Sequence, residues 1–467
     1  MSLNDPTLLY SKDDHKRVTS LFAVQIRYLK INAQYPRKLP YWLPKSLKFV
    51  GQLLMYVHNV FLIFLPLHLA VLHMKRTYDK FYDGRLEDIT DALIMVIVYG
   101  LSWYSTSYFM WYSKPLERFL ERISRNYRHH SLAGLTFVSS YVSYDRARKM
   151  MIIWASSCHS GVLLWGLAPI LMRSRTLPLK CWYPFDEMQP GVYESMYLLQ
   201  LLGQIFVGFA FANSSALYVS LVLVMLGQFD VLFCSLKNFD IPFKKLIKSF
   251  SIFGLSFFNF SKLQKEISVG QDDELNQYIF GTEYKTDLAV YETLRKNKNN
   301  FPKKSYKQHL NEALVDCFEH HQFIIDCCRE LEELFNPFCL IKSLQITIQL
   351  CLLMFVGVMG ERTPLRIINF IQYAALTIIE LLMFTYLGEL LRSHSLRGGE
   401  AMWRASWWRN STHVRQDILI FLLNSQRAVK LTAGKFFFMD VERFRSVVAQ
   451  AFSFLTLLQK LEAKNVK

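Results

Sequence analysis

Runs of apolar residues long enough to cross a lipid bilayer are the feature that most constrains this chain. A helix of about 20 predominantly apolar residues spans the hydrocarbon core of a membrane. Seven such runs occur, at residues 49–72, 90–112, 150–171, 193–226, 338–359, 365–388 and 436–461. Backbone N–H and C=O groups have no water to bond within hydrocarbon, so runs of this length without strict alternation form helices. We therefore expect an all-α membrane protein with seven transmembrane helices.

The placement of basic residues predicts the orientation of these helices. Lys and Arg number 8 in residues 1–46, 8 in 113–149 and 8 in 389–435, against 4 in 73–88, 3 in 172–192 and 2 in 360–366. Cytoplasmic loops are enriched in Lys and Arg. The first 46 residues also lack the apolar core of a signal peptide. We expect a cytoplasmic N-terminus and, after seven spans, an extracellular C-terminus.

The spans and the segments between them define the expected organisation of the chain. Residues 1–46 form a cytoplasmic segment, 47–227 hold helices one to four, and 338–388 hold helices five and six. Residues 228–337 form a long cytoplasmic loop with helical extensions, and 389–435 an amphipathic cytoplasmic anchor helix. Residues 436–467 carry the seventh helix. The extensions and the anchor helix are expected to pack into a helical anchor domain beneath the bilayer.

The net charge and the cysteines argue against other classes of protein. The excess of 54 basic over 38 acidic side chains gives +16, but these charges are spread over segments that flank the spans, so we expect no nucleic-acid partner. The eight cysteines show no paired framework. Phosphate-binding loops, Gly-rich dinucleotide turns and hydrolase or metalloprotease motifs are absent from the sequence, so we expect neither an enzyme nor a cofactor.

Two groups of polar residues in apolar surroundings have competing interpretations. Cys317, His321 and Cys328 share a helix face and could hold zinc, but a fourth ligand is missing and such cysteines usually lie in a core, so we expect no metal. Glu380 lies within the sixth span, where an ionised carboxylate costs about 3 kcal/mol or more. It is a functional acid, a structural partner of Lys342, or a group close enough to the interface to be wet.

Small and aromatic residues mark one face of the second and of the third span. Val96, Tyr99 and Gly100 share a face of the second span, and Cys158, Gly161 and Trp165 share a face of the third. Glycines on inner faces often only allow close helix packing. The functional alternative is a mainly apolar cavity in the outer half of the bundle that suits a small uncharged organic molecule.

The last helix has an unusual pattern of polar residues. In the stretch SVVAQAFSFLTLLQK, residues 446–460, a polar side chain recurs at every third position from Gln450 to Gln459. These polar groups cover about half of the helix circumference, and Leu457 and Leu461 lie within that half. Such a face either lines a pore or bonds to neighbouring helices. A pore built from one such helix per chain requires an oligomer.

Several motifs resemble those of the insect odorant receptor family. They are WYPFD at residues 182–186, Trp407, Ser425, LTAGKFF at 431–437 and AFSFLTLLQK at 451–460. The last is similar to the closing SYFTLL signature of that family, with Phe454 and Leu455 in place of the usual Tyr and Phe. The resemblance spans nearly the whole chain, and both ends differ from those of the shared co-receptor. The chain therefore looks like a ligand-tuning subunit.

The resemblance implies a ligand-gated, non-selective cation channel in the plasma membrane of olfactory sensory neurons. Its partners would be the odorant co-receptor, in a heterotetramer, a small volatile organic ligand, and membrane lipid. Carried over by position, the ligand pocket comprises Val96, Tyr99, Gly100, Cys158, Gly161, Trp165, Leu201, Gln204, Tyr373 and Thr377. The pore and its gate comprise Gln450, Ser453, Leu457, Lys460 and Leu461.

Two other classes remain as alternatives. A G-protein-coupled receptor also has seven helices, but it needs an extracellular N-terminus, against the charge distribution. A membrane transporter needs coupling acids at mid-membrane, and only Glu380 qualifies.

Overall fold

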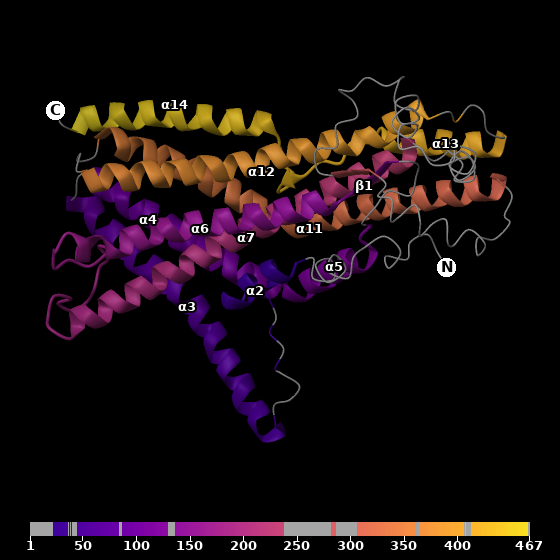
Figure 1. The fold of residues 1–467 in the computed structure, drawn as a ribbon. Coiled ribbons are helices and arrows are strands. Elements are labelled where there is room, and N and C mark those ends of the chain that lie inside the picture. Colours follow the sequence, from indigo (N-terminus) through magenta and orange to yellow (C-terminus); the bar gives the residue numbers. More distant parts are fainter. Residues whose placement is uncertain are drawn as a thin grey trace.

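The chain folds into a bundle of long helices (Figure 1). The computed structural model describes residues 22–35, 37, 39, 44–83, 86–128, 136–237, 282–285, 306–359, 364–405, 407 and 412–465. The helices are α2 (Ala23–Ile31), α3 (Lys45–Asp83), α4 (Leu86–Trp111), α5 (Ser113–Asn126), α6 (Tyr141–Leu171), α7 (Val192–Lys237), α11 (Tyr306–Met359), α12 (Pro364–Arg404), α13 (Thr412–Ser425) and α14 (Val441–Asn465). Two short antiparallel pairs join β1 (Thr136–Ser139) to β2 (Thr282–Lys285) and β3 (Thr432–Ala433) to β4 (Phe437–Phe438).

Six helices are long and apolar enough to cross a membrane. They are α3, α4, α6, α7, α11 and α12. The expectation of a mostly helical membrane protein is thus confirmed for six spans. Within the described residues, α14 does not reach the apolarity of the other six, because charged residues such as Glu442, Arg443 and Arg445 and the recurring polar residues interrupt its apolar positions.

Helix α7 is the centre of the bundle. It packs against α6, α11, α12 and α4, and its most apolar stretch is wholly buried. Aromatic rings fill the core around it, where Tyr218 stacks on Phe384 with centroids 4.3 Å apart and also meets Phe335. A helix buried on every side lacks a polar face. The evenly apolar sequence of α7 fits this position.

Several helices continue well beyond the thickness of a bilayer. Helix α11 has 54 residues, so it is about 80 Å long at about 1.5 Å per residue, whereas the hydrocarbon core measures about 30 Å. Side chains from distant segments bind this extension, since Arg128 forms an ion pair with Asp316 at 2.7 Å. The expected single anchor helix over 389–435 is instead the end of α12, then α13, then a hairpin. An amphipathic pattern alone does not reveal where one helix ends and another begins.

The β3–β4 hairpin leads the chain from α13 into α14. Residues 434–436 join the two strands, and the Phe436 N–H donates to the carbonyl of Ala433 at 3.1 Å. Gly434 and Lys435, the central residues of this turn, both have positive φ, at 62° and 61°, as a type I′ turn requires. The Gly434 N–H donates to the carbonyl of Asn336 at 3.1 Å, and a Cβ at Gly434 would meet Leu340 Cδ2 at 2.5 Å. The GK pair of LTAGKFF therefore meets two demands, the turn and the close contact with α11.

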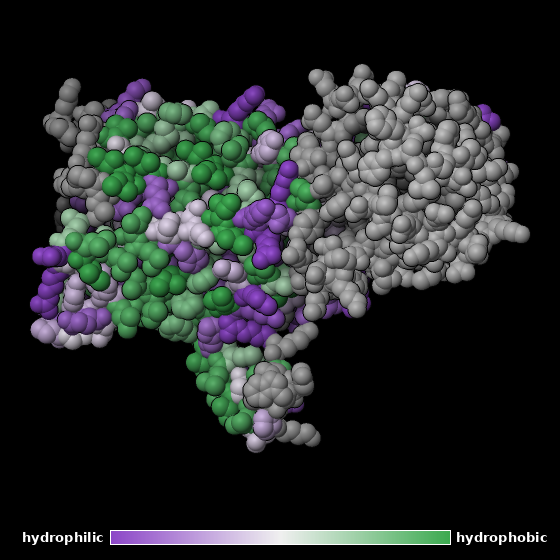
Figure 2. All heavy atoms as spheres, in the orientation of Figure 1, coloured by the Kyte–Doolittle hydropathy of each residue, from purple (hydrophilic) through white to green (hydrophobic). Residues whose placement is uncertain are grey.

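Helix α3 leaves the bundle at an angle (Figure 1). Its N-terminal half exposes large apolar side chains, among them Phe49, Leu54 and Tyr56, each more than 60% exposed. Figure 2 shows apolar side chains over much of the visible bundle surface and over this projecting half of α3. Such extended apolar surface is unusual in a soluble protein and fits contact with lipid.

Candidate ligand cavity

A small cavity lies between helices α4, α6, α7 and α12. Its volume is about 160 Å³, and its wall is mainly apolar. A cavity of about 150 Å³ lined by apolar side chains holds a molecule the size of benzene in another protein. The cavity is therefore suited to a small, largely apolar molecule.

Seven of the ten residues expected at a ligand pocket line this cavity. They are Tyr99, Cys158, Gly161, Trp165, Gln204, Tyr373 and Thr377. The other three, Val96, Gly100 and Leu201, are not among the lining residues.

The reason for the difference on α4 is a rotation of the helix. The wall is formed by Met95, Val98 and Tyr99 rather than by Val96, Tyr99 and Gly100. One residue corresponds to about 100° around a helix axis. A Cβ at Gly100 would meet no atom within 4 Å. The spacing of residues identifies positions that share a face, but it does not fix which face turns inward.

Leu201 lies at the contact between α7 and α6 instead. A Cβ built at Gly166 would approach its Cδ1 to 2.7 Å. Close helix contact continues further along the cavity wall, where a Cβ at Gly208 would lie 3.1 Å from Val162 Cγ2. Glycines at these sites let α6 and α7 approach closely. Gly166 and Gly208 thus have the role in close helix packing that was one interpretation of small residues in the spans.

The loop between α6 and α7 closes one end of the cavity. Leu179 from this loop lines the wall, and its backbone N–H and carbonyl both bond to the Gln200 side chain, at 2.8 and 3.1 Å. Trp165 donates its indole N–H to the carbonyl of Pro178 at 3.0 Å. Burial raises the pKa of the nearby Cys181 thiol to about 12, so the thiol stays protonated at neutral pH. The hydrogen bonds made by Leu179 and by Trp165 hold the loop in place over the cavity.

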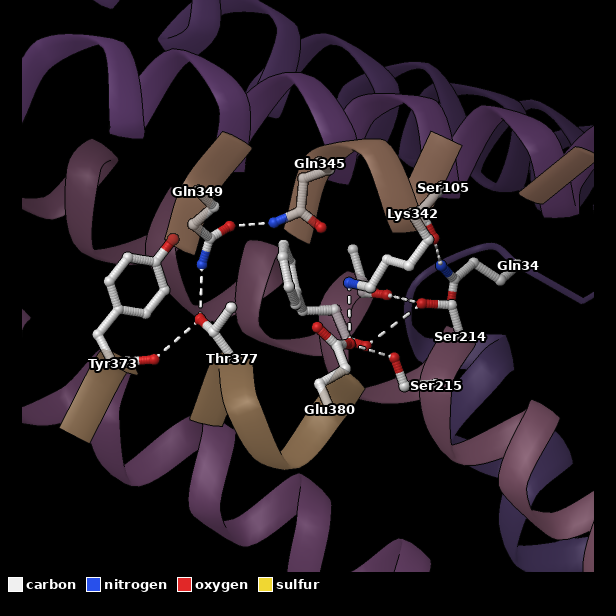
Figure 3. A network of polar contacts seen from close by, with 12 residues as sticks. Gln34, Ser105, Ser214, Ser215, Lys342, Gln345, Gln349, Tyr373, Thr377 and Glu380 are labelled. Atoms are coloured by element: carbon white, nitrogen blue, oxygen red, sulfur yellow. Dashed lines mark hydrogen bonds and ion pairs between the residues drawn. The ribbon is translucent and has the colours of Figure 1, made fainter. Parts of the chain in front are cut away.

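A buried ion pair lies at the opposite end of the cavity (Figure 3). Lys342 on α11 and Glu380 on α12 approach to 2.8 Å, and their side chains are only 1% and 2% exposed. Ser215 on α7 donates a hydrogen bond to the same carboxylate oxygen, Oε1. Of the alternatives for Glu380 drawn from the sequence, the structural pairing with Lys342 is present, and Glu380 also lines the cavity.

A second polar chain runs from α11 to α12 beside this pair. Gln345 donates to Gln349, Gln349 donates to the Thr377 hydroxyl at 2.8 Å, and Thr377 donates to the Tyr373 carbonyl at 2.9 Å. Figure 3 shows that this chain and the ion pair bridge the same two helices. Such paired polar groups keep the two helices in register.

Some lining residues were missed by the sequence reasoning. Trp154 and Gln372 both contribute to the wall. Trp154 is one turn before Cys158 on α6 and could have been found by helical spacing. Gln372 contacts the Ser160 hydroxyl of α6, and no local pattern in the sequence signals that contact.

One face of α14 packs on the bundle and the other faces outward. Val447 and Ala451 are buried against Ile346 and Leu381, from α11 and α12. Among the residues expected at a pore, Gln450, Ser453, Leu457 and Lys460 are exposed, whereas the side chain of Leu461 lies outside the described part. Polar groups on this face bond within their own helix, for example Ser453 to the carbonyl of Ala449 at 3.1 Å.

The three candidate zinc ligands lie in the helical extension. Cys317 and Cys328 are buried in the apolar core, and the ring of His321 packs edge-on against Phe421 at 4.9 Å. Within the described residues, no group of three or more His, Cys, Asp and Glu side chains could hold a metal ion.

Residues 85–452 match the family whose description is 7tm Odorant receptor. The chain belongs to the insect odorant receptor family. The receptor is 50% identical to putative odorant receptor 85e of Drosophila melanogaster, over 97% of this chain and 95% of that one. It is 34% identical to odorant receptor 83a of the same species, over 97% and 98%. Its identity to the odorant receptor coreceptor of Anopheles gambiae is 20%, over 61% and 63%, which fits a ligand-tuning subunit.

The fold of the receptor is similar to that of a solved family member. Olfactory receptor OR5 of Machilis hrabei, in a complex with eugenol, matches with a TM-score of 0.68 at 12% identity, over 96% of this chain and 100% of that one. Family and fold agree, so the receptor is an odorant receptor subunit of the cation-channel type. The alternative of a G-protein-coupled receptor is excluded by this membership.

Proposed function

We propose that the cavity between α4, α6, α7 and α12 binds a small volatile organic molecule, and that binding opens a cation pore formed with the co-receptor. Three features support the proposal: family membership, the mainly apolar wall, and a volume of about 160 Å³. In this proposal the N-terminus is cytoplasmic and the C-terminus extracellular, in the plasma membrane of olfactory sensory neurons. The cavity then lies in the outer half of the bundle, beneath the loop that contains Leu179.

The proposed pore-lining element is α14. Its outward face would carry Gln450, Ser453, Leu457, Lys460 and Leu461, with the leucines as a hydrophobic gate. A ring of apolar side chains closes a pore by excluding water. The exposure of Leu457, which is 50%, supports this role because the opposite face of the helix is already packed.

A short route connects the cavity to α14. Glu380 at the cavity wall is followed by Leu381, which packs against Val447 of α14. Its partner Lys342 is followed by Ser343, whose hydroxyl accepts a hydrogen bond from Arg443 of α14 at 3.2 Å. A ligand that shifts α11 relative to α12 would therefore act on the base of α14 through both neighbours. This arrangement supports coupling between ligand and pore.

Voltage-clamp recording tests the proposal. The receptor is expressed alone and with a co-receptor, and a panel of volatiles is applied at matched surface expression. Trp165→Ala removes a wall of the cavity, and loss of a buried aromatic contact typically costs a few kcal/mol, so the dose-response curve should move by about one decade or more. Trp103→Ala, on the same bundle but away from the cavity, is the control. Equal curves for both variants would contradict the proposal.

A further inference from the structure

The carboxylate of Glu380 has an unused acceptor at the cavity wall. Both of its contacts, with Lys342 Nζ at 2.8 Å and with the Ser215 hydroxyl, are made by Oε1. Among the described residues, none donates a hydrogen bond to Oε2. Glu380 is 2% exposed in the protein and lines the cavity. A charged oxygen that has no donor at a mainly apolar cavity wall is costly, because neither water nor a protein group compensates its charge fully.

The positive partner is shielded from the same cavity. The ammonium group of Lys342 lies 3.7 Å from the ring centroid of Phe211, which lines the wall, whereas Lys342 itself does not. A cation over an aromatic face is stabilised by the ring. A ligand in the cavity therefore meets the carboxylate but not the ammonium group.

These contacts define the chemistry of a matching ligand. A hydroxyl group can donate to Oε2 and satisfy it. Ketones, ethers and esters offer only lone pairs, which a carboxylate repels. A protonated amine would add a net charge beside a pair that is already neutral, at a large cost in a low dielectric.

Three other residues of the wall carry buried polar groups without a hydrogen-bond partner among the described residues: the side-chain amide of Gln204, the Tyr373 hydroxyl and the Trp154 indole N–H. The indole N–H can donate to the oxygen of an alcohol, an ether or a ketone alike, so it does not distinguish these ligands. Gln204 lies seven residues before Phe211 on α7, and Tyr373 lies seven residues before Glu380 on α12. Seven helical residues span about 10 Å. Hydrogen bonds to charged acceptors are roughly twice as strong as bonds between neutral groups. The carboxylate end of the cavity therefore dominates the choice of ligand.

We infer that Glu380 is the specificity-determining residue of the cavity and selects uncharged ligands that carry a hydroxyl group, namely alcohols or phenols. This inference rests on the proposed function, because it assigns the ligand class of the same cavity.

The experiment compares an alcohol with its methyl ether, the corresponding ketone and the corresponding amine on one carbon skeleton. Current is recorded from the receptor with a co-receptor. The alcohol should be more potent than the ether and the ketone by about tenfold, because a site built to bond a hydroxyl rejects analogues that lack it. The amine should be the weakest of the four.

Two variants test the residue itself. Lys342→Met with Glu380→Met removes both charges together, since removal of one alone would leave the other buried and unpaired. This double variant should respond to alcohol and ether within about twofold of each other. Glu380→Asp keeps the ion pair but withdraws the carboxylate by one methylene, and it should lower the potency of the alcohol more than that of the ether. Gln204→Met, at the other end of the cavity, should keep the preference for the alcohol.

The outcomes separate this inference from the proposed function. Equal potency of alcohol and ether in the parent receptor overturns the inference and leaves the proposed function standing. An unchanged preference in both Glu380 variants, or an amine more potent than the alcohol, also overturns it. Surface-expressed receptor that no volatile opens overturns both.

Discussion

A methyl group added at Gly161 should narrow the ligand range of the receptor. Gly161 lines the cavity, and a Cβ there would lie 3.0 Å from the amide nitrogen of Gln372. That nitrogen is the far end of a flexible side chain, and among the described residues its hydrogen bond is a long one of 3.4 Å to the Ser160 hydroxyl, so it can move aside. We therefore expect Gly161→Ala to fold and to project a methyl group into a volume of about 160 Å³.

The size of the effect follows from the tight volume. An extra methyl group in a filled apolar site typically costs about 1–3 kcal/mol, which corresponds to a loss of about 5- to 150-fold in potency. Ligands that fill the cavity should lose the most, and ligands one or two carbons shorter should lose little. A homologous series of alcohols measured by dose-response should therefore show its optimum shifted to a shorter chain.

Gly100→Ala is the matched control for this experiment. Both substitutions replace a helical glycine by alanine and gain about 1 kcal/mol of helix propensity, so this contribution cancels between them. The methyl group at Gly100 enters open space and does not reach the cavity. The same optimum in both variants, at equal surface expression, would refute the assignment of Gly161 to the ligand site.

Three further predictions concern the proposed gate, the proposed orientation in the membrane and the loop between α6 and α7. Leu457→Ser should raise the current recorded without ligand, because a hydroxyl wets an apolar constriction, whereas Phe452→Ser, about 140° around the helix, should not. Ser174→Asn creates a glycosylation sequon with Thr176 in the loop after α6, and a mobility shift removed by glycosidase should appear if this loop is extracellular. Cys181, which is partly buried, should resist alkylation by impermeant iodoacetamide derivatives from pH 7 to 9, because its pKa of about 12 keeps it a thiol throughout this range, and rapid labelling would contradict this raised pKa.

The sequence predicted the spans better than their ends and their rotation. Six spans follow directly from apolar length, since that signal depends only on local composition. The turn at Gly434 is fixed by contacts with Asn336 and Leu340 of α11, which lie about 100 residues earlier in the chain. No window of neighbouring residues contains that information.

The cavity shows the same division between local and distant information. Cys158, Gly161 and Trp165 were found together because helical spacing places them on one face. Glu380 is unusual in the sequence because it lies in an apolar span. Only the structure shows that Lys342 and Ser215 both contact its Oε1 and leave Oε2 without a donor. Patterns within one helix were readable, whereas the pairing of helices required the folded structure.

The complete burial of the C-terminal part of α7 has a consequence for how such receptors diverge. Every residue from Ala212 to Leu236 is buried, so almost any substitution there disturbs several neighbouring helices at once. The N-terminal part differs, since Leu198 and Leu202 are exposed and Gln204 lines the cavity. We expect inherited changes in odour preference to accumulate in the N-terminal part of this helix, while the sequence of its C-terminal part changes slowly. A single helix thus combines a part in which substitutions can change the ligand preference with a part in which most substitutions would destabilise the bundle.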